Sequence, residues 1–91
     1  MDLDDVVAGV LAAADLPADN RASAEASHLV GDDRFALLEA VTFARSPLPA
    51  SVLDSIDDYL ADGPIFGSDA NLDDSLNQRL AAMRRGDVRA A

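Results

Sequence analysis

The strongest constraint on the fold is the spacing of the large apolar residues, which follows the period of an α-helix in several separate segments. In residues 2–14 they fall at i, i+3, i+4, i+7 and i+8 and form one stripe along a helix: Leu3, Val6, Val7, Val10 and Leu11. No segment shows the sustained alternation of apolar and polar residues that is expected of a half-buried strand. We therefore predict an all-α fold, a compact bundle of four or five short helices.

Prolines, glycines and capping residues mark the ends of the other predicted helices. A second helix is expected over 21–30, capped by Asp19 or Asn20 and stopped by Gly31. A third starts at 32–33 and runs to 44. A fourth starts with Pro49 as its first residue and runs to 61, and a fifth spans 72–85. Because the linking segments are short, neighbouring helices should run roughly antiparallel.

The apolar faces of these helices differ in strength. The second helix has only a weak face, formed by Ala22, Ala26, Leu29 and Val30. The third has a broad face and should be the most central helix, with Phe35, Leu38, Val41 and Thr42 in line and Leu37 beside them. The fifth carries Leu72, Leu76, Leu80 and Met83 in line, which favours a packed helix.

The length of 91 residues predicts a single helical domain over 1–91, within which the helix 72–85 could be semi-independent. Alanine supplies much of the apolar composition, and the chain has one tyrosine and no tryptophan. Its core should therefore be thin, and a homodimer is one way in which it could bury more surface.

The charge restricts the partners. The chain has seventeen acidic residues, seven arginines and no lysine, which gives a net charge of −10. We therefore expect no direct binding to nucleic acid, because a phosphate backbone would be repelled. No apolar run is long enough to span a bilayer, and the acidic start of the chain is unlike a signal peptide, so we expect a cytoplasmic protein without membrane contact. The acidity is either a host-wide solubility trait or a face for a basic partner.

Four of the arginines lie in the last thirteen residues, at positions 79, 84, 85 and 89. The rest of the chain is correspondingly more acidic. Two sides of one molecule, or two chains of a dimer, could meet through this asymmetry.

Candidate catalytic groups are few. The chain has no cysteine, and His28 is its only histidine, without a serine motif of the G-x-S-x-G type. Glu25 and His28 have the i, i+3 spacing of di-iron bundles, and Glu39 could add a carboxylate, but the helices are short for such a site. We therefore predict no enzyme and assign no catalytic residue, metal site or cofactor.

Two short motifs are considered on the fifth helix and the segment before it. Residues 69–73 match positions 1, 3 and 5 of a calcium loop, but Asp74 and Leu80 replace its glycine and glutamate, so the run suits a turn and a helix cap better. The triplet Asp74-Ser75-Leu76 is similar to the phosphopantetheine attachment triplet of acyl carrier proteins. In that family two helices follow the serine, whereas only fifteen residues follow Leu76 here.

The second half of the chain resembles small addiction-module antitoxins over residues 44–91. The stretch 53–58, Leu-Asp-Ser-Ile-Asp-Asp, is similar to their leucine-x-serine-leucine-acidic segment. After an acidic linker, residues 79–88 match their terminal pattern Arg-Leu-x-x-x-x-x-Gly-x-Val. The chain departs from the family where an aromatic residue usually opens the last helix. The resemblance implies a helix that neutralises a toxin.

We therefore expect an acidic protein–protein interaction module, antitoxin-like, which binds a basic partner by occluding its working surface. Charge would raise the association rate, and buried apolar anchors would set the lifetime of the complex. The predicted partner-binding residues are Asp54, Asp57, Asp58, Asp62, Ile65, Phe66, Leu76, Leu80 and Arg84. The alternatives are a nucleic-acid mimic that inhibits a DNA- or RNA-binding protein, and an acyl-carrier-like docking domain.

Overall fold

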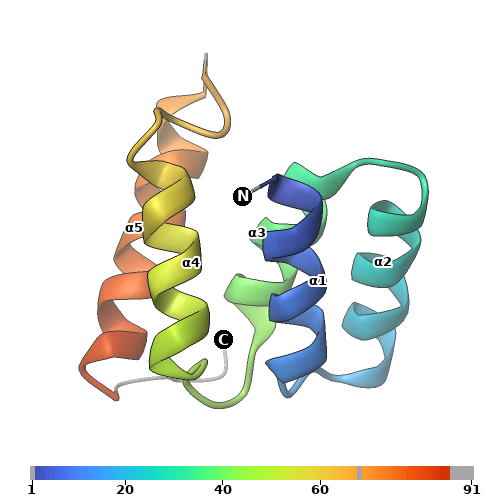
Figure 1. Cartoon of the computed structure of the whole chain (residues 1–91). Coiled ribbons are helices and arrows are strands. Elements are labelled where there is room, and N and C mark those ends of the chain that lie inside the picture. The colour runs from blue at the N-terminus through green and yellow to red at the C-terminus, as the bar shows by residue number, and fades with distance from the viewer. Residues whose placement is uncertain (1, 68, 87–91) are drawn as a thin grey trace.

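The computed structural model describes residues 2–67 and 69–86 and shows five α-helices (Figure 1). They are α1 (Leu3–Ala13), α2 (Ala18–Leu29), α3 (Asp33–Phe43), α4 (Ala50–Leu60) and α5 (Ala70–Arg84). Successive helices alternate in direction, and the described residues contain no strand, so the all-α bundle is confirmed. None of the helices in these two ranges is long and apolar enough to cross a bilayer.

Proline sets the start of two helices, and the starts differ slightly from those predicted. Pro17 is the N-cap of α2, so this helix begins three residues before the predicted Arg21. Pro49 is the N-cap of α4 and not its first residue. Asp69 caps α5, where its Oδ1 accepts a hydrogen bond of 3.4 Å from the backbone N–H of Leu72. Proline has the fixed φ that suits the entry to a helix, which explains why both helices begin directly after a proline.

The turn between α2 and α3 is a Schellman motif. The backbone N–H of Asp32 donates to the carbonyl of Ser27 at 2.8 Å, and that of Gly31 donates to the carbonyl of His28 at 3.1 Å. Gly31 has a φ of +85°, a conformation that strains residues with a Cβ. The predicted glycine stop of α2 is therefore confirmed, and the turn holds the end of α2 close to the start of α3.

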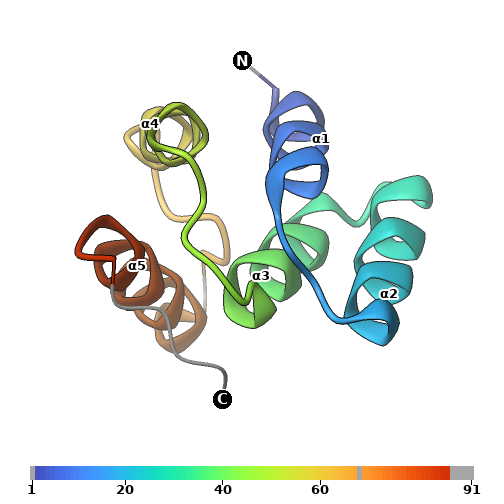
Figure 2. The ribbon, with the colours of Figure 1, turned by 90° about the horizontal axis from the view of Figure 1, so that it is seen from below.

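Helix α3 lies at the centre of the bundle, where it packs against α1, α2 and α5, while α4 packs against α1 and α5. The view along the helices shows α1, α2 and α3 on one side and α4 with α5 on the other (Figure 2). The core contains aliphatic residues from all five helices and from the segments that link them, and its largest fully buried side chains are Val7, Val10, Leu37, Val41, Ile56 and Leu76. The central position predicted for the third helix is confirmed.

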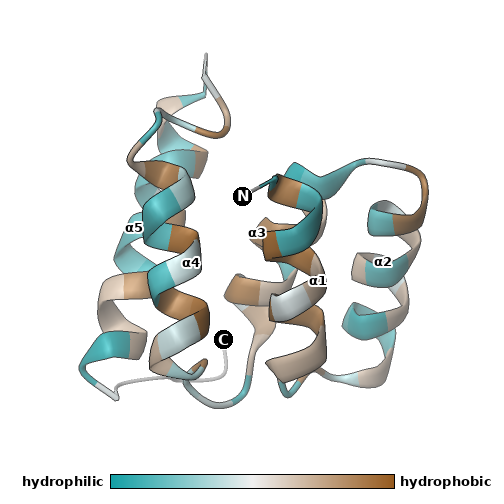
Figure 3. Ribbon diagram, in the orientation of Figure 1, coloured by the Kyte–Doolittle hydropathy of each residue, from teal (hydrophilic) through white to brown (hydrophobic). Residues whose placement is uncertain are grey.

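The predicted face of α2 is wrong, and that of α3 is right for Leu37 and Val41 but wrong for Phe35 and Thr42. The buried face of α3 is Ala36, Leu37, Ala40 and Val41, whereas Phe35 is 52% exposed and Thr42 is also exposed. In α2 only Ala24 is buried. Leu29 and Val30 are almost fully exposed, and Figure 3 shows a hydrophobic stretch at the turn that follows α2. Because α3 packs against three other helices, small alanines allow a close approach where a phenylalanine would hold the helices apart.

Candidate functional site

A pocket lies where the α4–α5 loop meets the start of α5. This end of the two helices is the upper one in Figure 1. The pocket is a cavity of about 410 Å³, within the size range of small-ligand pockets. Residues from the end of α4, the loop and the first two turns of α5 line it: Leu60, Gly63, Pro64, Gly67, Ala70, Asp73, Asp74 and Asn77. We refer to this cavity as the α4–α5 pocket.

A buried aspartate shapes the loop above the pocket. The Asp73 carboxylate accepts hydrogen bonds from the backbone N–H groups of Ile65 at 2.9 Å and Phe66 at 3.2 Å. These bonds compensate for the cost of burying a charged group and hold the loop onto α5. Ile65 is buried in the core, and the ring of Phe66 lies 6.1 Å from that of Phe35 in a tilted pair. Ile65 and Phe66 are therefore fixed in position beside the pocket.

The lining of the pocket combines an apolar wall with carboxylates. Leu60 and Pro64 supply the apolar surface, and Asp74 and Asn77 project from the exposed side of α5. Two further acids are exposed nearby: Asp58 on the last turn of α4 and Asp62 just beyond the end of this helix. A long side chain with an aliphatic stem and a cationic head matches this combination, because each part meets its own kind of surface.

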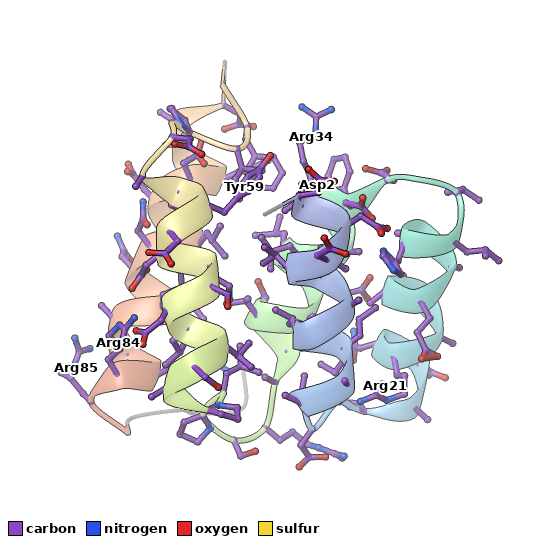
Figure 4. The ribbon with its side chains drawn as sticks, in the orientation of Figure 1. Asp2, Arg21, Arg34, Tyr59, Arg84 and Arg85 are labelled. Carbon is purple, nitrogen blue, oxygen red and sulfur yellow. The ribbon has the colours of Figure 1, made fainter. Side chains whose placement is uncertain are left out.

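The predicted acids of α4 divide into two pairs. Asp54 and Asp57 both accept hydrogen bonds from the guanidinium of Arg84, at 2.9 Å in the case of Asp54. The hydrogen bond to Asp57, and to a smaller extent the one to Asp54, raises the pKa of Arg84 above its ordinary value. Figure 4 shows Arg84 beside α4 and Arg85 turned outward. Asp58 and Asp62 remain exposed and form no ion pair with an arginine of the described ranges.

The predicted apolar contacts of α5 lie inside the bundle. Leu76 is 1% exposed, and Leu80 and Met83 are buried with it. On the same helix the Arg79 guanidinium donates to the carbonyl oxygens of Val41 at 3.1 Å and Ala44 at 2.8 Å, where α3 ends. In the free chain, therefore, α5 presents Asp74, Asn77 and Ser75 to solvent, while its leucines face the core.

His28 has different neighbours from those that the sequence suggests. The Glu25 carboxylate forms an ion pair with Arg21, with 3.6 Å between Oε2 and Nη1. The Glu39 carboxylate accepts hydrogen bonds from the side chains of Asn20 and Ser23. Instead, His28 Nδ1 lies 2.7 Å from Asp33 Oδ1 and 3.7 Å from Asp4 Oδ1. Sequence analysis missed this group because Asp4 and His28 belong to helices that meet only in the folded bundle.

The calcium-like run over 69–73 does not converge on a common point. Asp69 caps α5 and Asp73 binds the loop, so both carboxylates are already used by backbone N–H groups. This arrangement agrees with the turn and helix cap expected for these residues.

Comparison of the chain with protein-family models, curated proteins and solved structures gives no significant match.

Proposed function

We propose that this protein is an acidic interaction module that binds a basic protein by accepting an arginine or lysine side chain in the α4–α5 pocket. The observation that carries the proposal is the pocket itself, a cavity of about 410 Å³ with an apolar wall and an exposed carboxylate at Asp74. A pocket that joins apolar surface with a few oriented polar groups is the usual form of a recognition site.

The distribution of charge supports a basic partner. Four of the six described arginines are already bound within the molecule to carboxylates or carbonyl oxygens: Arg21, Arg45, Arg79 and Arg84. The net charge of −10 already counts every arginine, so it is the excess of carboxylates that no arginine of the chain neutralises. Such a field attracts a cationic surface and raises the rate of encounter, while the pocket supplies a specific contact.

The binding mode follows from the lining. The aliphatic stem of the incoming side chain would lie on Leu60 and Pro64, and its cationic head would reach the Asp74 carboxylate and the Asn77 side-chain carbonyl. Asp73 would keep its bonds to the loop and so preserve the shape of the pocket. An antitoxin-like protein would use this contact to cover the basic working surface of its partner, with Leu76 and Leu80 still in the core.

The two alternative functions have less support. A nucleic-acid mimic needs its acids on one continuous surface, but exposed acids lie on α1, α2, α4 and α5. An acyl-carrier-like domain would carry its prosthetic arm on Ser75, which is exposed on α5. No contact of Ser75 favours that role over an ordinary surface serine.

The proposal is tested by following backbone amide signals by NMR while an arginine-rich peptide is added. We expect the largest changes at Gly63, Gly67 and Asn77, and weaker binding as salt is raised. Asp74→Asn should reduce the affinity clearly more than Asp19→Asn, a matched change of one exposed charge on α2. Equal losses in the two variants, or shifts spread evenly over all acidic residues, would show that the peptide binds only to the general negative field.

A further inference from the structure

We propose that Asp4, His28 and Asp33 form a binding site for a divalent transition-metal ion of the zinc class, which links α1, α2 and α3. Each residue offers one ligand atom, and the three atoms lie within 4.8 Å of one another. This site is separate from the α4–α5 pocket, and its test is independent of the proposed function.

The separations suit a small ion. Ligand atoms about 2.0–2.1 Å from a tetrahedral zinc ion lie roughly 3.3 Å apart. The distances from His28 Nδ1 to Asp33 Oδ1 (2.7 Å) and to Asp4 Oδ1 (3.7 Å) fall on either side of that value. An ion would fit if the Asp33 carboxylate moved slightly away from His28 Nδ1 and the Asp4 carboxylate moved slightly toward it. Both movements require only small side-chain rotations.

The backbone holds two of the ligands in place before an ion binds. His28 is in the last turn of α2 and Asp33 is the first residue of α3, and the Schellman turn at Gly31 sets the geometry between them. Their side chains are 24% and 17% exposed, so both are partly shielded from water. The third ligand, Asp4, comes from the first turn of α1, a helix that packs against both α2 and α3. Its side chain is 70% exposed and free to adjust.

The donor set indicates the class of ion. One imidazole nitrogen and two carboxylate oxygens suit zinc, cobalt, nickel or manganese, whereas calcium and magnesium prefer oxygen ligands alone. The two carboxylates balance the charge of a divalent ion. The ion would bind Nδ1 of a neutral imidazole with the proton on Nε2, and water would complete the coordination.

The experiment is titration of the untagged protein with zinc chloride by calorimetry, and with cobalt chloride by visible absorption. We expect one ion per chain, visible cobalt bands and a higher Tm with zinc. His28→Asn retains a polar group near the position of Nδ1 but removes the imidazole, and it should abolish binding. Asp4→Asn should weaken binding at least about tenfold, since even outer-shell partners of a metal contribute that much.

The control is Asp5→Asn, which removes the same charge from the same turn of α1 at an exposed residue outside the group. It should leave the zinc affinity almost unchanged. An equal loss of zinc affinity in Asp4→Asn and Asp5→Asn would overturn the proposal, as would the absence of zinc binding to the unmodified protein. Magnesium or calcium binding as tight as zinc binding, and retained in His28→Asn, would overturn it too. Because Asp4 is exposed, its variant should fold normally, which circular dichroism without metal can verify.

Discussion

Replacing Leu76 with alanine should destabilise the whole bundle, because this side chain is 1% exposed and lies where α5 meets the rest of the core. Burial of this kind makes a Leu→Ala change cost about 2–5 kcal/mol, through lost transfer energy and the cavity left behind. Since α3 and α4 are the only described helices that α5 contacts, some relaxation should occur, and we expect a loss of about 2–4 kcal/mol. A domain of this size is stable by about 5–14 kcal/mol, so the loss is a large fraction of the total. The corresponding fall in Tm is roughly 10–25 °C.

The measurement is urea denaturation followed by circular dichroism at 222 nm, with Gln78→Ala as control. Gln78 is an exposed residue of the same helix, and its replacement should change the stability by no more than about 0.5 kcal/mol. Equal stability of the Leu76 and Gln78 variants would refute the reasoning and indicate that α5 is a detachable arm. Deletion of residues 70–91 tests the same point, and we expect the shortened chain to lose its cooperative unfolding.

Three further changes test single contacts, each by urea denaturation. Arg79→Met should cost about 1.5–3 kcal/mol, clearly more than Arg85→Met, because it removes charged hydrogen bonds to the end of α3. Asp73→Ala should cost about 1–3 kcal/mol by leaving two loop N–H groups without their acceptor, while Asp74→Ala should be nearly neutral; equal effects would contradict the role of Asp73. Arg84→Gln should destabilise the protein only slightly, and less at high salt, because its ion pairs are exposed.

The existence and order of the helices could be predicted because the signals are local. Apolar spacing in the first helix predicted its buried residues Val6, Val7, Val10 and Leu11. The glycine stop of the second helix was also predictable, since Gly31 has a φ of +85° that glycine adopts without strain. The start of α2 was placed three residues late because a capping aspartate was preferred to the proline that opens the helix.

The buried face of α3 could be predicted only in part from the same periodicity. The large side chains correctly indicated the burial of Leu37 and Val41 but also suggested Phe35. The rest of the buried face is Ala36 and Ala40, which allow the neighbouring helices to approach closely. Phe35 instead pairs with Phe66 of the α4–α5 loop. The α4–α5 pocket was not predicted either, although its neighbours Asp62 and Phe66 were among the predicted partner-binding residues.

The sequence by itself determined the helical class, the approximate ends of the helices and the excess of negative charge. These properties depend on composition and on residues a few positions apart. Only the tertiary structure decided that Arg84 binds Asp54 and Asp57, that Arg79 reaches Val41, and that His28 faces Asp4 and Asp33. The contact between Arg79 and Val41 spans 38 residues, and the packing of α5 on α3 creates it. A one-dimensional pattern cannot specify such pairs, because several helix rotations satisfy the same apolar stripe and each brings different polar groups together.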